Sequence, residues 1–475
     1  MIKEIPVGNG FYLSESLPVS QQFCRNMYPN YPETTAISNS QLFPCPGLVE
    51  VADAGENQIN RGSELLSDKP YFVCGQALYR LEPDLTLANL GEISGAGRVS
   101  MAENGTQLCI VVPGTGFGYI YDEQNGLQQI TDQDFTANGN AEIVVFIDGY
   151  FVFTTNTKKF FCSAINNGLD YNALDFGTAE ADPDAIRSAH VYKNQLYILG
   201  SETIEVFQNV GGVDFPFQRI TGYVIPKGIA APFSVADFDG SFVFIGQGVN
   251  ESPKIYMFTG SGVSPISTTA IDTILQQEKD IKDAFVWTYT FRGATFCGFS
   301  FASSTIVFDS KASALSGKKI WHERLSQNLQ EKSRWRANSI ITAYNKLLVG
   351  DSEGGLIGEI DNDTATEYGN FIDRFFSIQT LENNSQPITF NYVELVLESG
   401  LGLNDQKDPQ VRLGYSDNSK VTRLKGMRGA GKQGEYGRKV RWNQLGRTNR
   451  WRTFFFRMTD PVRFVVLKVV LSLDG

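Results

Sequence analysis

The chain has 475 residues, of which 42% are apolar, 12% are aromatic and 46 are glycine. This length allows a large core or several domains, and the composition is typical of a globular, strand-rich and turn-rich protein. No apolar segment of signal-peptide length opens the chain, and no stretch approaches the roughly 18 apolar residues of a membrane helix. We therefore expect a soluble protein that is made in a cytoplasm and has no membrane anchor.

Charge is distributed unevenly along the chain, whose net charge is −11. Residues 401–475 contain 16 Lys and Arg against 6 Asp and Glu, whereas residues 1–400 contain 25 against 46. The basic end is either a strand domain with solvated charged faces, or a docking surface for an acidic partner or for nucleic acid.

Cysteine and histidine usage argues against a metal site. The six cysteines lack CxxC spacing, and four of them lie in or beside apolar runs, so we expect buried, reduced thiols. Only His190 and His322 could supply imidazole ligands. We predict no metal ion and no cofactor.

The first 62 residues form the first predicted segment. They carry prolines at positions 6, 18, 29, 32, 44 and 46 and only short apolar runs. Proline lacks the backbone donor of a strand and restricts the residue before it. We therefore predict an irregular N-terminal arm over residues 1–62, which lies on the rest of the chain or on another subunit.

Residues 63–365 contain a repeated unit of two short apolar runs separated by a polar break. The starts of the first runs lie 37, 42, 46, 46, 54 and 51 residues apart, at Tyr71, Leu108, Tyr150, Leu196, Phe242, Phe296 and Leu347. One four-stranded propeller blade needs about 40–50 residues. Several runs are apolar at successive positions, which suits strands that are covered on both faces. The pattern predicts an all-β fold with a β-propeller of about seven blade-like repeats.

Tight-turn pairs precede five of the first runs: Asn104-Gly105, Asp148-Gly149, Lys193-Asn194, Asp239-Gly240 and Arg292-Gly293. Asn-Gly and Asp-Gly accept the positive φ of a two-residue hairpin turn. Each pair is therefore expected to join its first run to a preceding strand.

One helix is predicted within this region, over residues 270–285. Thr268 or Thr269 could cap its start, and one face is apolar, formed by Ile271, Ile274, Leu275, Ile281 and Phe285. We expect it on the outside of a blade, or alternatively in a subunit contact.

The repeat ends near residue 365, and longer strands are predicted over residues 388–398 and 453–473. Glu394 and Glu398 alternate with apolar residues, as in a sheet with one solvated face. We predict a basic C-terminal domain over residues 366–475, resembling a β-sandwich and containing a flexible glycine-rich loop at 424–437.

Motifs for catalysis are weak. GMRGAGK at 426–432 has the glycine and lysine spacing of a phosphate-binding loop, but Gln433 stands where a Ser or Thr must meet Mg²⁺. Acidic stretches at 236–240 and 361–367 lack the calcium-loop pattern, and no GxSxG motif is present. A glycosidase needs only carboxylates, so composition alone leaves that class open. We predict no catalytic residues.

Arginine and aromatic residues alternate in the segment 438–457. We select Arg438, Arg441, Trp442, Arg447, Arg450, Trp451 and Arg452 as a partner-interface set. Three interpretations remain open: cross-strand Arg–aromatic pairs that stabilise a sheet, a protein interface, or phosphate binding to nucleic acid.

Seven stretches together resemble one known protein family. They are FPCPGL (43–48), RGSELLSDKPYFVCGQALYRL (61–81), GEISGAGRVSMAENG (91–105), LYILGSETIEVFQNVGG (196–212), PKGIAAPFSVA (226–236), GSGVSPISTTAIDTIL (260–275) and VRWNQLGR (440–447). In this order they resemble the packaged-DNA stabilisation proteins, or tail hubs, of short-tailed bacteriophages.

The resemblance implies a non-enzymatic virion protein that is assembled in the host cytoplasm. It would form a six-fold ring below the portal and its adaptor, extend the DNA channel and help to retain packaged DNA. Its implied partners are the adaptor, tail fibre or tailspike, the plug or needle, and DNA that passes without sequence specificity. The alternatives are a carbohydrate-binding or glycan-cleaving propeller and an intracellular scaffold propeller.

Overall fold

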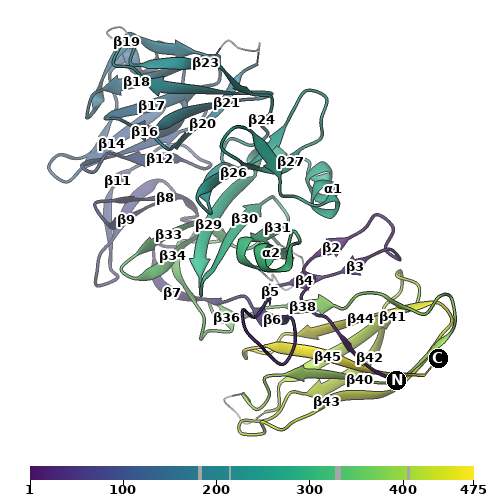
Figure 1. The fold of residues 1–475 in the computed structure, drawn as a ribbon. Coiled ribbons are helices and arrows are strands. Elements are labelled where there is room, and N and C mark those ends of the chain that lie inside the picture. Colours follow the sequence, from purple (N-terminus) through teal and green to yellow (C-terminus); the bar gives the residue numbers. More distant parts are fainter. Residues whose placement is uncertain (180–183, 213–214, 327–332, 404–406, 475) are drawn as a thin grey trace.

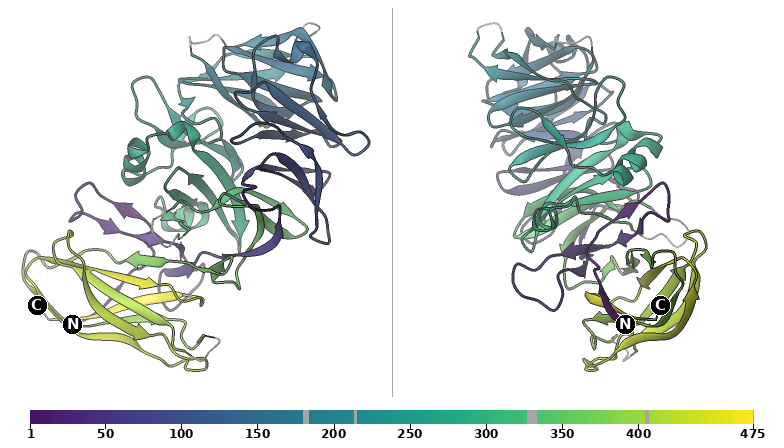
Figure 2. Two further views of the ribbon diagram at one scale, coloured as in Figure 1. Left: turned by 180° about the vertical axis from the view of Figure 1, so that it is seen from behind. Right: turned by 45° about the vertical axis from the view of Figure 1, so that its right-hand side comes forward.

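The computed structural model describes residues 1–179, 184–212, 215–326, 333–403 and 407–474. Most of the described elements are strands, arranged as a ring of small sheets with a two-layered sandwich at one end (Figure 1). In both views of Figure 2 the two termini lie on the sandwich. Within the described residues, no helix is long and apolar enough to cross a membrane.

Seven antiparallel sheets follow one another along the chain and form the blades. The first four contain β8 (Asn60–Leu66), β9 (Lys69–Cys74), β10 (Ala77–Leu81) and β11 (Leu87–Glu92); β12 (Ser100–Glu103), β13 (Gln107–Val112), β14 (Phe117–Asp122) and β15 (Gly126–Gln129); β16 (Ala141–Ile147), β17 (Tyr150–Thr155), β18 (Lys159–Ala164) and β19 (Asn167–Thr178); and β20 (Ile186–Tyr192), β21 (Gln195–Gly200), β22 (Ile204–Asn209) and β23 (Phe217–Ile225).

The fifth blade has two short first strands, and the last two blades continue into other parts of the chain. Their strands are β24 (Gly228–Ile229), β25 (Ala236–Phe238), β26 (Ser241–Gln247), β27 (Lys254–Phe258) and β28 (Val263–Pro265); β29 (Phe285–Phe291), β30 (Ala294–Ser300), β31 (Thr305–Asp309) and β32 (Trp321–Glu323); and β33 (Ala337–Ala343), β34 (Lys346–Asp351) and β35 (Leu356–Asp361).

Each predicted pair of apolar runs forms the second and third strands of one blade. The first runs lie in β9, β13, β17, β21, β26, β30 and β34, and the answering runs lie in the strands that follow them. The turn prediction is confirmed at Asp148-Gly149, Lys193-Asn194, Asp239-Gly240 and Arg292-Gly293, where both residues have positive φ. In the Asn104-Gly105 pair only Gly105 has positive φ, because three residues connect β12 to β13.

Apolar side chains pack between neighbouring blades, which explains the unbroken apolar runs. For example, Leu108 and Ile110 of β13 pack against Tyr71 and Val73 of β9, whereas Cys109 of the same strand faces the third blade. All six cysteines are buried and free, as predicted. Both faces of a blade are therefore covered, which fits strands without polar alternation.

The N-terminal segment differs from the predicted irregular arm, because several of its strands complete other sheets. β7 (Gly47–Asp53) pairs antiparallel with β35 and supplies the outermost long strand of the seventh blade. Two short strands, β36 (Thr366–Glu367) and β37 (Asn370–Phe371), extend this sheet, and the first blade already begins at Asn60. β2 (Tyr12–Leu13) and β3 (Gln21–Gln22) form a separate hairpin.

The sandwich combines strands from both ends of the chain. One sheet contains β43 (Val440–Thr448), β40 (Ile388–Leu397), β45 (Val466–Asp474), β6 (Gln41–Pro44), β5 (Met27–Asn30) and β1 (Ile2–Ile5). The facing strands are β4 (Cys24–Arg25), β38 (Arg374–Ser377), β44 (Trp451–Met458), β41 (Gln410–Ser416) and β42 (Arg423–Gly429), with β39 (Leu381–Glu382) beside β44.

The helix prediction was too long. α1 spans Thr269–Gln277, a 3₁₀ turn covers Ile281–Asp283, and Phe285 already belongs to β29. Thr268 precedes the helix, but its side chain makes no capping hydrogen bond. The apolar residues over 270–285 therefore belong to a helix, a turn and the start of a strand, and not to one helix. The other described helices are α2 (Ser310–Ser316) and a 3₁₀ turn at Gln133–Thr136.

Candidate partner surface and the junction that supports it

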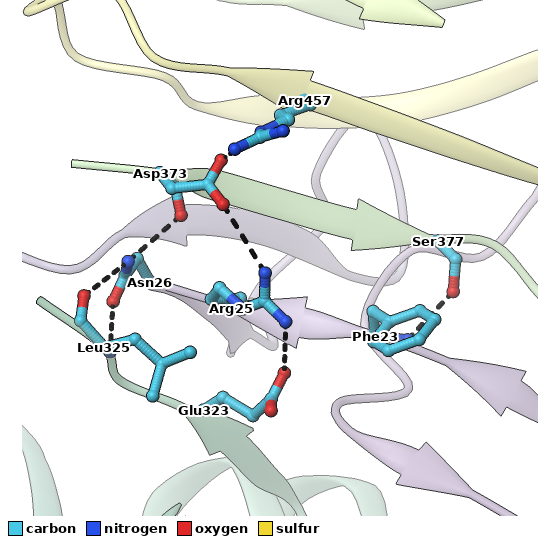
Figure 3. A network of polar contacts seen from close by, with 8 residues as sticks. All are labelled: Phe23, Arg25, Asn26, Glu323, Leu325, Asp373, Ser377 and Arg457. Atoms are coloured by element: carbon cyan, nitrogen blue, oxygen red, sulfur yellow. Dashed lines mark hydrogen bonds and ion pairs between the residues drawn. The ribbon is translucent and has the colours of Figure 1, made fainter. Parts of the chain in front are cut away.

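The sandwich is joined to the propeller through one continuous sheet. β4 pairs parallel with β32 of the sixth blade and antiparallel with β38 of the sandwich. Figure 3 shows this junction, where Phe23 N–H donates to Ser377 Oγ at 2.9 Å beside the short strand. A sheet shared by both parts resists their relative motion, because bending there breaks strand pairing.

Asp373 is the polar centre of the junction. Its carboxylate accepts from Arg457 Nε at 2.5 Å and from Arg25 Nη1 at 3.4 Å, and Arg25 also faces Glu323 of the sixth blade. Asn26 Nδ2 donates to the carbonyls of Asp373 and Leu325 at 3.0 and 2.9 Å (Figure 3). Arg25 and Asp373 are both buried, so each charge depends on its ion-pair partners for compensation.

Burial sets the ionisation of the neighbouring groups. It lowers the pKa of Arg374 to about 10, while two backbone carbonyls, of Asp460 and Ala365, accept from its guanidinium. Burial, and to a smaller extent Arg324, lowers the pKa of His322 to about 3. His322 is therefore neutral near pH 7, and among the arginines described at the junction, Arg25 and Arg457 are the ones that pair with carboxylates.

Two members of the predicted interface set are structural. Trp442 is buried and donates through Nε1 to the Gly426 carbonyl at 3.2 Å. The Arg452 side chain is only 2% exposed and forms a bidentate pair with Asp417, with N–O distances of 2.6 and 3.0 Å. Its guanidinium carbon lies 4.3 Å from the ring centroid of Tyr415. Neither side chain is available to a partner.

Arg441 and Trp451 are half-buried. Arg441 pairs across the strands with Glu394, with Nε 2.8 Å from the carboxylate, and lies 4.0 Å from the Tyr392 ring centroid. Trp451 stacks loosely with Arg450, whose guanidinium carbon is 5.7 Å from the indole centroid. The Arg441 contacts match cross-strand Arg–aromatic pairing, whereas Arg450 and Trp451 are neighbours in sequence.

Arg438, Arg447 and Arg450 are the exposed members of the set. Arg438 lies at 3.9 Å from Asp408 in a partly solvated ion pair. The structure therefore divides the predicted set: three exposed guanidinium groups could contact a partner, and the remaining residues support them from within the sandwich.

The sequence prediction missed an exposed strand beside this set. Residues 424–437 were expected to be a flexible loop, but β42 occupies Arg423–Gly429 and is followed by β43 instead of the helix that a phosphate loop requires. Leu424 is 69% and Met427 47% exposed, and Arg428 Nε donates to the Arg441 carbonyl. Alternating basic and apolar residues at 423–428 were the available signal.

Loss of Arg452 should destabilise the sandwich. Arg452→Ala removes a buried cation and leaves Asp417, which water partly reaches, so we expect the free energy of unfolding to fall by about 2–3 kcal/mol. Arg450→Ala should change it by less than about 0.5 kcal/mol, because that side chain is exposed. Urea unfolding monitored by tryptophan fluorescence would compare them; equal stability would contradict the buried role.

The described residues contain no group of three or more His, Cys, Asp or Glu side chains arranged to hold a metal ion. The exposed part of the predicted set consists of guanidinium groups on strands and turns, and arginine in this setting serves recognition of anions and carboxylates. What these side chains offer chemically is therefore a binding surface.

Two solved structures resemble the chain only distantly. The WD40 β-propeller domain of Doa1 is 13% identical, covers 66% of this chain and 96% of its own, and has a TM-score of 0.38. A computationally designed protein, Ika8, is 12% identical, with 66% and 99% coverage and the same TM-score.

Comparison with known families covers both parts of the chain. The model described as "Bacteriophage P22 Gp10, beta-propeller" matches residues 3–365, and the model described as "Bacteriophage P22 Gp10, beta-sandwich" matches residues 373–472. The tail hub protein gp10 of Salmonella phage P22 is 23% identical over 461 residues, which are 94% of this chain and 92% of the relative. Both the propeller and the sandwich predictions are confirmed, and the chain belongs to the bacteriophage P22 Gp10 family of tail hub proteins.

Proposed function

We propose that this chain is a structural tail hub of the phage virion, which assembles as a six-fold ring below the portal and its adaptor. The observation that carries the proposal is similarity along almost the whole chain to the tail hub protein of phage P22. The ring extends the DNA channel and helps to retain packaged DNA. This role is structural, and the comparisons do not favour the glycan-binding alternative.

A rigid subunit supports a structural role. One apolar core cluster includes Val243 of the fifth blade, Phe308 of the sixth, Ile5 of the N-terminal segment and Phe456 of the sandwich. Because these parts share a core, they move as one body. Rigid subunits repeated around a ring convert weak single contacts into strong overall binding.

The exposed basic surface of the sandwich is the proposed docking site for an acidic partner on the portal side. Residues 420–450 hold ten Lys and Arg and one acidic residue, Glu435. Exposed Leu424 and Met427 in β42 add apolar area to this charge. Combining apolar contacts with arginine is typical of energetically important interface residues.

DNA passes through the ring without sequence-specific contacts in this proposal. The first 400 residues carry 46 acidic against 25 basic residues. A surface of the same sign as the phosphates repels them, so DNA would slide without adhering. The tail fibre or tailspike and the plug or needle would bind other faces of the ring.

Charge reversal on the sandwich tests the docking surface. Arg438→Glu, Arg447→Glu and Arg450→Glu together should weaken binding to an adaptor–portal complex at least about tenfold, because attraction becomes repulsion. Arg452 is left unchanged because it is buried. The measurement is size-exclusion chromatography with light scattering, alone and with that complex.

Three exposed lysines from the acidic part of the chain provide the matched control. Lys158→Glu, Lys279→Glu and Lys282→Glu change the net charge by the same amount at positions outside the sandwich. Normal binding of the arginine variant to the adaptor–portal complex would show that this surface is not the docking site. Wild-type protein that stays monomeric and does not bind the complex would contradict the proposed ring.

A further inference from the structure

Two arginines meet at the end of the propeller axis where the inner strands begin. Arg98 lies just before β12 of the second blade, and Arg334 lies just before β33 of the seventh. Phe285, the first residue of β29 in the sixth blade, forms a parallel bridge with Phe233 and contacts both arginines through its ring. Arg98 therefore reaches from the second blade to the sixth and seventh.

Both guanidinium groups converge on one neutral oxygen. Arg98 Nη2 donates to Asn338 Oδ1 at 3.1 Å, and Arg334 Nη2 donates to the same atom at 2.9 Å. The guanidinium carbons of Arg98 and Arg334 lie 3.6 and 5.1 Å from the Phe285 ring centroid. Two like charges are thus held close together by an amide and an aromatic ring.

No carboxylate within the described ranges forms an ion pair with either arginine, in contrast to neighbouring Arg336, which pairs with Asp351 and Glu353. Burial, reinforced by Arg334, lowers the pKa of Arg98 to about 9, and burial also lowers the pKa of Arg334, although the charges of Asp351 and Glu353 act on Arg334 in the opposite direction. Placing two such charges together costs free energy unless an anion compensates them.

Donor atoms remain for such an anion. Arg334 Nη1 contacts the carbonyls of Trp335 and Ala337. Three other nitrogen atoms make no hydrogen bond to the described residues: Arg98 Nε, Arg98 Nη1 and Arg334 Nε. The other described residues therefore leave these N–H groups without a hydrogen-bond partner. None of these three atoms is fully buried.

We propose that Arg98 and Arg334 form a binding site for a phosphate group. Paired guanidinium forks match the spacing of phosphate oxygens, and each charge-assisted hydrogen bond is about twice as strong as a neutral one. The doubly charged form of phosphate, which predominates above its second pKa of roughly 6–7, balances both arginines, whereas a single carboxylate leaves one uncompensated. The source is either free inorganic phosphate or a phosphomonoester, such as the 5′-terminal phosphate of a nucleic acid strand, because a phosphodiester carries one negative charge and, like a carboxylate, leaves one arginine uncompensated.

Inorganic phosphate is the probe for this site in the intact chain. Isothermal titration calorimetry at constant ionic strength should show saturable binding of one equivalent, stronger at pH 7.5 than at pH 5.5, because deprotonation gives the dianion. Arg98→Gln and Arg334→Gln should each weaken binding by about tenfold or more. Arg187→Gln, at an exposed arginine near the start of the inner strand β20, should bind as wild type.

The outcomes separate the two sources and the null result. Competition by a short single-stranded oligonucleotide with a 5′-phosphate, but not by the same oligonucleotide without it, assigns the site to a terminal phosphomonoester, and absence of competition by either assigns it to the free ion. Wild-type protein that shows no saturable phosphate binding overturns the proposal, whether or not the variants fold. Unchanged binding by a folded Arg98→Gln or Arg334→Gln variant, verified by circular dichroism, overturns it equally.

Discussion

Asp373→Ala is expected to lower the free energy of unfolding by about 3–5 kcal/mol, because it leaves buried Arg25 without its carboxylate partner on the sandwich side. Arg457 loses its partner as well, but solvent partly reaches its side chain, so it contributes less. Equilibrium unfolding in urea, followed separately by fluorescence and circular dichroism, would measure the effect.

Asp373→Ala has a second expected effect, on hydrogen exchange. Arg25 and Asp373 connect the two parts, so weakening them should expose the backbone around β4 and β38 to hydrogen exchange before the blades open. Asp363→Ala is the control, since that carboxylate is exposed and contacts only its own turn. Equal stability of the two variants would show that the Asp373 pairs contribute little.

Leu48→Asp should also destabilise the protein by about 3–5 kcal/mol, because it places an unpaired charge in the core of the seventh blade. Leu48 is 1% exposed and belongs to β7, which pairs with β35 about 300 residues later in the chain. The blade loses its outer strand if β7 detaches. Thermal unfolding measured by calorimetry would detect a lowered midpoint.

Val49→Asp is the matched control on the same strand. Successive side chains of a strand point to opposite faces, and Val49 is 38% exposed. We expect a change below about 1 kcal/mol. If Val49→Asp were as damaging as Leu48→Asp, the effect would come from strand propensity and not from burial of a charge.

Much of the propeller was predictable because its signal is local. The second and third strands of each blade are buried on both faces, so runs such as residues 196–199 are apolar throughout. First and fourth strands such as β12 and β15 are short and partly exposed, and leave little pattern. The closing strand β7 was missed because pairing over 300 residues has no local signature.

The candidate surface was predictable only in part. Sequence identified the arginine-rich segment, but not that Arg452 is enclosed by Asp417 and Tyr415, because those partners come from another strand and the turn after it. Glycines at 426, 429 and 431 suggested a loop, whereas tertiary pairing with β41 makes residues 423–429 a strand. The exposure of Arg447 and Arg450 likewise follows from sheet packing.

The pairing of β1 with β45 sets the order of events during synthesis. Ile2 lies opposite Ser472, so β1 has to wait for a strand that is made about 470 residues later. At about 5–20 residues per second, a ribosome needs roughly 25–95 s to reach that partner. β1 therefore leaves the exit tunnel as an unpaired edge, and the sandwich acquires its final shape only after β45 has been made.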